Sequence, residues 1–451
     1  MTDGAKISWV NHASYVLERS GVALLTDPWF EGMAFVDGWA LCSPTRRNDD
    51  LLQRITHIWI SHEHPDHFSP ATLRSIPSEL RRNITVLYQL SRDHKVIDFC
   101  EQLGFAEVRE MRANEWVQLA TDFRIMCNPW RLGDSYLVAE TPEGVVLNVN
   151  DCVIRTRREA ESILDDLSGR SPKVLLTQYS YANRIGNPEQ TDLRRQAARA
   201  ELDSVVNQSS VLRPEFVVPF ASFFWFCHQE NGYLNDALST ATDAVRLVEE
   251  RTESIPIVLY PGEQWSLGKD PPSAHCSAGR YDSDLAERLV DHKPSAAIRS
   301  VPLATLIEDG NAFSADLVSI NGRLQLWAAR RLGPLRPVRV WVSDLGVAVQ
   351  LSYRGIRPVT RPQETCDIAV GSEPLEFLLH HRFGGMTLFI TGRFVAPAGG
   401  RLQRIIPLVN LREANNRGID LVGWLRGRVF FKLEQSMAAG SRIARWLRRH
   451  R

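Results

Sequence analysis

Paired cysteines, net charge and long apolar runs are all missing from this sequence. Seven cysteines are scattered through 451 residues without a Cys-x-x-Cys pair, which fits a reducing compartment better than a disulfide scaffold. Lys plus Arg and Asp plus Glu both number 53, and this balance argues against general binding to nucleic acid. No run approaches about 18 apolar residues and no apolar signal segment opens the chain, so we expect a cytoplasmic protein without a transmembrane segment.

The composition that remains is globular and indicates more than one domain. Hydrophobic residues make up 44% and charged residues 24%, which excludes wholesale disorder. In residues 1–262, short β-type runs alternate with helical stretches, so we expect an α/β sandwich there. Residues 263–300 gather Pro, Ser, Gly and Asp and are expected to form a linker or wrapped loop. Residues 301–435 are expected to form a second, α+β unit, and residues 436–451 a basic tail.

The second unit and the tail carry finer expectations. Residue type predicts strands at Val338–Ser343, Val347–Leu351, Thr365–Val370 and Met386–Gly392, and helices at Phe313–Arg331 and Glu373–His380. In the tail, Ile443, Trp446 and Leu447 fall on one side of a basic stretch. That pattern fits an interfacial helix for an anionic lipid or a partner. The preferred interpretation is a solvated terminal helix that packs its Trp on its own domain.

The segment that carries chemistry is His62-Glu63-His64-Pro65-Asp66-His67, directly after a predicted strand at Ile55–Ser61. Residues two apart in an extended segment point the same way, so His62 and His64 can bind one ion together. Asp66 and His67 then turn toward a second position nearby. Four ligands within six residues at the end of a strand predict a metal site.

This motif resembles the metal-binding signature of the metallo-β-lactamase fold, a four-layer αββα sandwich with a dinuclear site at one edge. The stretches Val10–Ser14 and Leu25–Trp29 are similar to the opening hairpin of its lactonase-like branch. The resemblance implies that Asp151, in the stretch Asn148–Cys152, bridges the two metals. A carboxylate suits this role because each of its oxygens can hold one cation.

A closer resemblance covers residues 8–235, which are similar to the metallo-β-lactamase-like portion of the CMP-N-acetylneuraminate hydroxylase family. Its motifs here include Pro219–Phe224, followed by His228, and the resemblance implies that His228 is the last ligand of the second metal. The stretch Glu373–Phe394 resembles that family's C-terminal region and a sterol-carrier-type fold. Such a unit would supply an apolar wall or a dimer contact, so a homodimer is left open.

One position departs from the family pattern. Where the fold usually supplies a histidine, this chain has Trp130, and the aspartate that follows is Asp134. Either the first metal loses one ligand or Asp134 replaces it, as in a diiron β-hydroxylase branch of the family that uses a carboxylate there. A carboxylate shifts the ligand set toward oxygen, which suits iron or manganese better than zinc.

The metal decides the reaction. Two irons activate O₂ for insertion into a C–H or N–H bond, whereas two zincs generate a hydroxide that attacks an ester, lactone, amide or phosphodiester. We favour a diiron monooxygenase acting on a small or carrier-bound metabolite and keep the zinc hydrolase as the alternative, with Asp66 and Asp151 catalytic in either. The intact motif argues against a decayed, non-catalytic scaffold.

Electrons for an oxygenase need a source. The Cys-x-His and Cys-x-x-His pairs of a Rieske cluster are missing, and so is a Gly-x-Gly-x-x-Gly after a strand. The donor is therefore expected to be a separate protein such as a ferredoxin or a reductase.

The remaining candidates have weaker support. His12 and Asp27 are expected beside the metals, where they orient ligands, or else to pack the hairpin. Tyr181, Asn183 and Arg184 follow a predicted strand and either hold a polar or anionic substrate or form an ordinary surface loop. The residues interpreted as structural are His57, His94, Cys152, His380 and His381.

Overall fold

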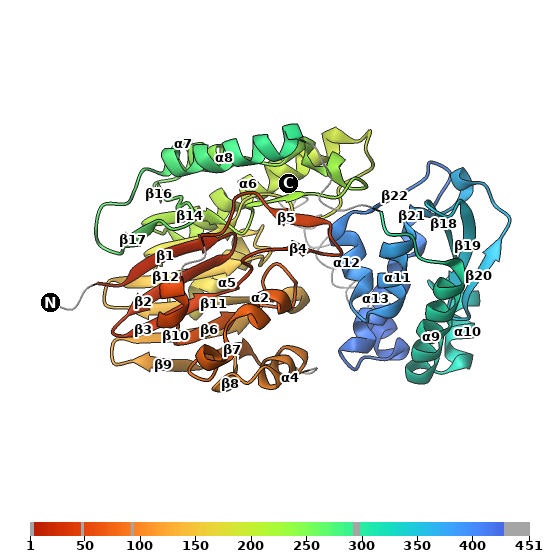
Figure 1. Ribbon diagram of the computed structural model, residues 1–451, viewed down its shortest axis with the longest axis horizontal. Coiled ribbons are helices and arrows are strands. Elements are labelled where there is room, and N and C mark those ends of the chain that lie inside the picture. Colours follow the sequence, from red (N-terminus) through yellow and green to blue (C-terminus); the bar gives the residue numbers. More distant parts are fainter. Residues whose placement is uncertain (1–3, 47–48, 92–93, 292–297, 428–451) are drawn as a thin grey trace, which may run out of the picture. The chain divides into compact units, whose positions relative to one another are not determined.

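The computed structural model describes residues 4–46, 49–91, 94–291 and 298–427. The chain divides between residues 297 and 298 into two compact units, coloured red to green and blue in Figure 1. Within the described residues, no helix combines the length and apolarity needed to cross a membrane. The basic tail expected at residues 436–451 lies outside the described residues.

Two seven-stranded sheets form the middle of the first unit. The first has the order β17-β1-β2-β3-β6-β7-β8 and the second β16-β14-β13-β12-β11-β10-β9. The strands of the first sheet are β1 (Lys6–Asn11), β2 (Ser14–Arg19), β3 (Val22–Thr26), β6 (His57–Ile60), β7 (Thr85–Gln89), β8 (Glu107–Met111) and β17 (Gln264–Ser266). Those of the second are β9 (Trp116–Ala120), β10 (Phe123–Pro129), β11 (Ser135–Thr141), β12 (Gly144–Asn150), β13 (Val174–Gln178), β14 (Phe216–Phe220) and β16 (Ile255–Pro256). A small sheet joins β4 (Met33–Ala34), β5 (Trp39–Leu41) and β15 (Phe224–Phe226).

Alternating apolar side chains explain why these strands form two stacked sheets. In β6, Trp59 lies in the core shared by both sheets, while Ile58 and Ile60 pack on the opposite face. In β12, Val146 joins the shared core and Leu147 packs on the far side. Because successive strand residues point to opposite faces, each sheet has one face on the shared core and one face available to helices.

Helices cover those outer faces (Figure 1). The helices of the first unit are α1 (Asp49–Arg54), α2 (Pro70–Ser75), α3 (Ser78–Arg81), α4 (Lys95–Gln102), α5 (Arg157–Asp166), α6 (Thr191–Leu212), α7 (Ala241–Arg251) and α8 (Ala274–Asp291), with 3₁₀ turns η1 (Arg131–Gly133) and η2 (Gly232–Ala237). Apolar residues of α2 and α4 pack on the first sheet, and those of α5 and α6 on the second. The layer order is helix, sheet, sheet, helix, which is the predicted sandwich.

The segment expected as a linker or wrapped loop at residues 263–300 instead contains β17 and the 18-residue helix α8. Ala278 and Tyr281 of α8 are buried, and the Tyr281 ring stacks on Phe223 with 3.8 Å between centroids. This apolar spacing of three to four residues stabilises a helix against the core. Pro271, Pro272 and Ser273, just before the helix, gave the segment its loop-like composition.

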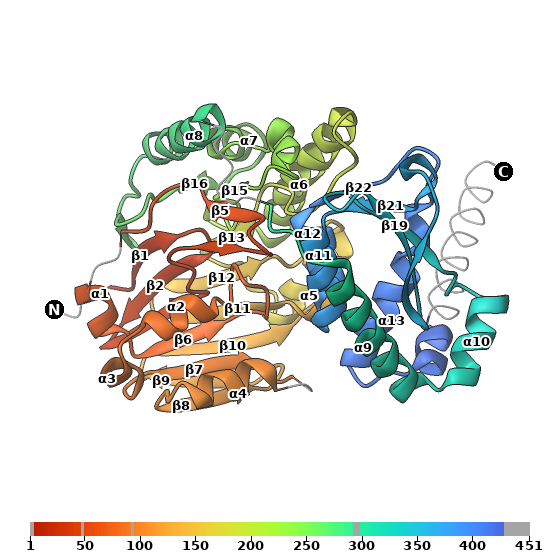
Figure 2. The same ribbon diagram turned by 45° about the vertical axis from the view of Figure 1, so that its right-hand side comes forward.

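The second unit is built on a five-stranded sheet with the order β20-β19-β18-β21-β22. Its strands are β18 (Val338–Val342), β19 (Val347–Ser352), β20 (Gly355–Val359), β21 (Ile368–Val370) and β22 (Phe394–Val395). Its helices are α9 (Leu303–Asn321), α10 (Arg323–Leu332), α11 (Ser372–His380), α12 (Gly384–Thr391) and α13 (Ile406–Asn416), with 3₁₀ turns η3 (Gln363–Thr365) and η4 (Leu402–Arg404). Val340 of β18, Phe313 of α9 and Leu378 of α11 share one core, and Figure 2 shows α9, α11 and α12 beside the sheet.

Two predictions for this unit were wrong. The strand expected at Met386–Gly392 is part of helix α12, because Gly384 and Gly385 let that helix approach its neighbours closely. A Cβ on Gly384 would lie 2.3 Å from the carbonyl oxygen of Phe377, and one on Gly385 would lie 2.5 Å from a methyl group of Val409. The single helix expected at Phe313–Arg331 is two helices, which separate at Gly322 where φ is 74°.

Candidate metal centre

The carboxyl ends of strands from both sheets meet at one edge of the first unit. Strand β3 pairs in parallel with β6, so Asp27 and His62, which follow these strands, lie at the same edge. In the second sheet β10 and β12 both run antiparallel to β11, which brings Asp134 and Asp151 to one edge as well. Carboxylates and imidazoles from distant parts of the chain thereby come together.

A first cluster contains His62, His64 and Asp134. Nε2 of His62 lies 2.8 Å from Nδ1 of His64 and 4.0 Å from Oδ1 of Asp134. The hydroxyl of Ser61 lies 2.9 Å from Nδ1 of His62, so the other ring nitrogen faces the cluster. These three side chains are close enough to hold one metal ion.

A second cluster contains His12, Asp66 and His67. Oδ2 of Asp66 lies 3.4 Å from Nε2 of His12 and 3.3 Å from Nε2 of His67. Nδ1 of His67 lies 3.0 Å from Oδ2 of Asp27, an arrangement that fixes the ring and leaves Nε2 for a metal. All four side chains are buried.

Asp151 joins the two clusters. Its Oδ2 lies 3.9 Å from Nε2 of His62 and 3.3 Å from Nε2 of His67, and these three residues form a third group of potential ligands. One carboxylate therefore reaches a histidine of each cluster, which is the arrangement of a dinuclear site.

Several buried polar atoms at this edge make no hydrogen bond to the described residues. Both ring nitrogens of His12, Nε2 of His67, and Oδ1 of both Asp66 and Asp151 are buried and make no hydrogen bond to any described residue. Each such group costs about 1–3 kcal/mol if it is left unsatisfied. Metal ions would satisfy the atoms that face the centre, including one nitrogen of His12, so the residues fit a two-metal centre.

Electrostatics at the site favour the metal-binding protonation states of His62, His64 and Asp66. Burial lowers the pKa of His62 and His64, which keeps both rings neutral. Burial would raise the pKa of Asp66, but His67 and His12 hold it well below its usual range. Burial would lower the pKa of His67, but Asp66, Asp151 and Asp27 raise it well above its usual value. A bound cation would replace the proton that this carboxylate environment attracts to His67.

Four residues around the centre have left-handed backbone conformations. The φ angles are 47° at His12, 37° at Asp27, 53° at Asn150 and 52° at Ala221. Hydrogen bonds hold two pairs of them together, from the amide of Ala221 to the carbonyl of His12 at 3.2 Å and from Nδ2 of Asn150 to Oδ2 of Asp27 at 2.8 Å. Strain of this kind in non-glycine residues is common at functional sites.

The geometry bears on two sequence-based assignments, which both stay predictions. His228, expected as the last ligand of the second metal, belongs to none of the three clusters found among the described residues. Its Nδ1 accepts a hydrogen bond from the amide of Glu230 at 3.1 Å. His12, expected only to orient ligands or pack the hairpin, is the histidine that faces Asp66. Its signal was the Asn-His-Ala-Ser stretch directly after the first strand.

The residues proposed for substrate do not form a common surface. Tyr181 is buried, and its hydroxyl donates to the carbonyl of Leu234, so this residue packs the fold. Arg184 bonds Oδ1 of Asn187 at 2.6 Å, and Asn183 is exposed. At the departure from the family pattern, the Trp130 ring nitrogen donates to the carbonyl of Val153 at 3.3 Å.

The histidines and the cysteine interpreted as structural have ordinary surroundings. Nδ1 of His57 lies 2.8 Å from the hydroxyl of Thr56, and Cys152 is buried. His94 and His380 are exposed beside Glu110 and Asp309, and His381 packs against Phe377.

The fold and this edge define a class of protein. Residues 6–123 match the family model described as a beta-lactamase superfamily domain, which is the superfamily that the sequence predicted for this part of the chain. Its site is that of a metal-dependent enzyme of this fold.

Curated relatives are more specific. The chain is 25% identical to cytidine monophosphate-N-acetylneuraminic acid hydroxylase of Cricetulus griseus over 290 residues, which cover 59% of this chain and 49% of the relative. The Danio rerio protein of the same name is 23% identical over 242 residues, 51% of this chain and 40% of the relative. The chain thus spans about half the length or less of these relatives.

Solved structures with a partial likeness include both kinds of chemistry. The diiron β-hydroxylase CmlA of Streptomyces venezuelae is 17% identical, with a TM-score of 0.42 and coverage of 59% of this chain and 55% of that one. An isothiocyanate hydrolase from Delia radicum gut bacteria is 14% identical, with a TM-score of 0.42 and coverage of 58% and 100%.

Proposed function

We propose that the first unit is a non-haem diiron monooxygenase that hydroxylates a C–H or N–H bond of a small or carrier-bound metabolite. The observation that carries this proposal is the position of Asp134 beside His62 and His64. With Asp66 and Asp151, it gives the centre three carboxylates, and an oxygen-rich ligand set suits iron or manganese better than zinc. The curated relatives, which are named hydroxylases, support the same class of reaction.

The reaction consumes one O₂, two electrons and two protons, and it yields hydroxylated substrate and one water. Two irons bound at this edge would supply the activation of O₂. The chain's own residues would hold them: His62, His64 and Asp134 in the first cluster, Asp66 and His67 in the second, together with Asp151. Asp27 fixes the ring of His67 so that Nε2 faces the centre.

The proposal needs an electron donor, and we place it on a separate protein such as a ferredoxin or a reductase. The sequence has no cysteine and histidine pairs of the Rieske type. The sterol-carrier-like character of the second unit stays a proposal based on the stretch Glu373–Phe394, as does a homodimer.

Metal content and O₂ uptake test this proposal together. Protein loaded from equal iron and zinc is expected to retain about two irons per chain, and after anaerobic reduction with dithionite it should consume O₂. Asp134→His is the matched variant, because it restores the all-histidine first site and should raise the zinc-to-iron ratio. Zinc retention by the unaltered protein, without O₂ uptake after reduction, would contradict the oxygenase.

The alternative is a dinuclear zinc hydrolase, which is favoured by the four imidazoles of His12, His62, His64 and His67 at the same edge. Zinc binds imidazole well and lowers the pKa of a bound water to about 7. In this case Asp66 would hold the nucleophilic water. Turnover of esters, lactones, amides or phosphodiesters by the zinc form would support this function.

A further inference from the structure

A histidine of the first hairpin lies in the second cluster. We propose that His12, and not His228, is the ligand that completes the second metal position with Asp66 and His67. The inference rests on the dinuclear centre of the proposed function, but it does not depend on whether the reaction is oxygenation or hydrolysis.

The ring of His12 is buried beside aromatic side chains and makes no hydrogen bond to any described residue. The side chain is 1% exposed, and both of its nitrogens lack hydrogen bonds to the described residues. Trp29 and Phe224 contact the ring edge-on, at centroid distances of 5.4 and 5.9 Å. Nε2 faces Oδ2 of Asp66 at 3.4 Å, so this nitrogen points to the metal edge.

The backbone holds His12 in this orientation against its own preference. Its φ of 47° lies in the left-handed region, which is strained for a non-glycine residue. Oδ1 of Asn11 accepts a hydrogen bond from the amide of His12 at 2.9 Å, and Nδ2 of Asn11 donates to the carbonyl of Ser43 at 2.8 Å. The amide of Ala221 binds the carbonyl of His12. Three segments of chain therefore fix one imidazole beside Asp66.

Nε2 of His228 is also buried and makes no hydrogen bond to any described residue, so the difference between the two histidines is one of position. Nδ1 of His228 accepts from the amide of Glu230, and its own amide donates to Oδ1 of Asn231 at 3.0 Å. These bonds belong to the turn that follows β15. The described residues place His12, and not His228, within metal-ligand distance of Asp66 and His67.

The test compares His12→Gly with His228→Ala. Glycine accepts a positive φ and leaves a space for added imidazole. His12→Gly should retain about one metal per chain, with at least 100-fold weaker binding at the second position, and imidazole should restore the second metal. His228→Ala should bind two metals as the unaltered protein does. Elemental analysis and competition with a chromophoric chelator for Co²⁺ measure both, and thermal unfolding checks the fold.

Opposite results would overturn the assignment. If His12→Gly binds two metals with unchanged affinity, or if imidazole fails to restore the second metal to a folded variant, His12 is not the ligand. If His228→Ala loses a metal while folded, His228 holds that position. Two zincs in the unaltered protein without O₂ uptake would contradict the oxygenase alone and leave this inference intact.

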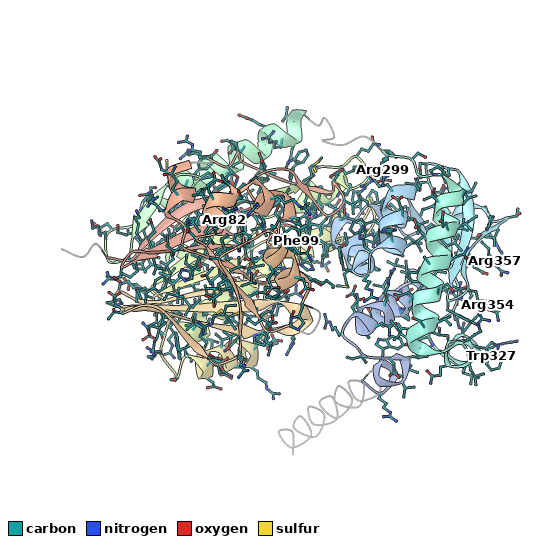
Figure 3. The ribbon with its side chains drawn as sticks, turned by 60° about the horizontal axis from the view of Figure 1, so that its bottom comes forward. Arg82, Phe99, Arg299, Trp327, Arg354 and Arg357 are labelled. Atoms are coloured by element: carbon teal, nitrogen blue, oxygen red, sulfur yellow. The ribbon has the colours of Figure 1, made fainter. Side chains whose placement is uncertain are left out.

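A separate observation concerns the surface of the second unit. Helix α10 buries Leu326 and Ala329 but exposes Leu324, Trp327 and Leu332, whose exposed fractions are 76%, 43% and 91%. Figure 3 shows Trp327 along one side of this unit together with Arg354 and Arg357. Large apolar side chains that remain exposed together indicate an interaction surface.

Arginines are frequent in and after this helix. Residues 317–343 contain five arginines and no acidic residue, and the side chains of Arg323, Arg331 and Arg336 are exposed. The geometry points to an anionic lipid surface as the occupant, because apolar side chains beside arginines are typical of interfacial helices. A ten-residue helix is about 15 Å long, too short to supply the roughly 800 Å² that each partner buries in a stable protein interface.

Vesicle sedimentation tests this second proposal on the full chain. Phosphatidylcholine vesicles with phosphatidylglycerol should bind the protein, and vesicles without it should not. Arg323→Gln with Arg331→Gln should weaken binding about 30-fold, at about 1 kcal/mol per arginine. Leu324→Ser with Trp327→Ser should weaken it comparably. Leu193→Ser, at a half-exposed leucine on α6, is the matched control and should bind normally.

The basic tail is the same in all of these variants, so its contribution is constant. Unchanged vesicle binding by both α10 variants would overturn the proposal. A dimer of the unaltered protein that the α10 variants abolish would also overturn it, because the surface would then be occupied by a second copy.

Discussion

Two groups of buried polar side chains, one in each unit, are satisfied in different ways. In the second unit, Arg393 is fully buried and bonds Glu373 at 2.9 Å, and Asp367 is bound by Arg339 and Arg404 at 3.0 and 3.3 Å. At the metal edge of the first unit, buried nitrogen and oxygen atoms face one another without hydrogen bonds to described residues. Buried charges that pair with other side chains stabilise the fold. Buried polar atoms without a hydrogen-bond partner require a ligand from solution.

This difference predicts that stability depends on metal in one unit only. A ligand that binds the folded state alone stabilises it by about 2.7 kcal/mol at 100 times its dissociation constant. Chelation should therefore destabilise the first unit and leave the unfolding transition of the second unchanged.

The largest expected effect comes from removing a carboxylate at the metal edge. Asp66→Ala removes the carboxylate that faces both His12 and His67, so the second metal should be lost and activity should fall about 1000-fold or more, a loss of about 4 kcal/mol in transition-state stabilisation. Elemental analysis and turnover measure the two losses. Asp192→Ala, at an exposed position on α6, is the control. Full activity of Asp66→Ala would contradict the oxygenase and the hydrolase alike.

The second-largest effect is expected from a substitution that breaks a buried ion pair in the second unit. Glu373→Gln leaves the buried guanidinium of Arg393 without its carboxylate. Removal of one partner of a buried ion pair typically costs about 3 kcal/mol. Urea unfolding should show this loss in the second unit's transition with metal affinity unchanged. Glu364→Gln, at an exposed position, should have little effect, and an equal loss there would contradict the assignment.

The same contrast explains what could be predicted from the sequence. The His62–His67 motif is local: six consecutive residues at the end of one strand supply ligands to both positions, so their proximity needs no knowledge of the fold. Asp134 could be predicted as a candidate only through the family pattern, and its distance from His62 required the structure. The role of His12 depends on contacts with Trp29, Phe224 and Ala221, which no local pattern contains.

The errors in the second unit have a related cause. The strand predicted at Met386–Gly392 rested on Thr, Leu, Phe and Ile, which favour strands when intrinsic preference decides. Here Gly384 and Gly385 permit close helix packing, and tertiary contacts override that preference. In α8, likewise, three residues of loop-like composition preceded a helix whose apolar spacing becomes evident once Tyr281 is seen to stack on Phe223.

A smaller effect is expected from a change at Asp27, which orients a histidine at the metal edge. Asp27 accepts hydrogen bonds from the Ser61 amide and hydroxyl and from Asn150, and it orients His67. Asp27→Asn should weaken binding at the second metal position by about 10- to 100-fold, as expected for partners of metal ligands. Chelator competition measures this change. An unchanged affinity would mean that packing alone orients the ring of His67.

The smallest expected effect is the pH dependence of the second unit. Burial would raise the pKa of Asp367, but Arg339 and Arg404 lower it below its usual value. Because the folded state favours the carboxylate, the stabilisation is present above the pKa of the unfolded chain, about 3.9, and is lost as the pH falls through the lower folded value. Asp367→Asn should flatten this decline in urea unfolding measured at several pH values below about 5. An equally steep decline in the variant would assign the acid sensitivity to other carboxylates, such as Glu373 and Asp344, whose pKa values are also lowered against burial by their hydrogen-bond partners.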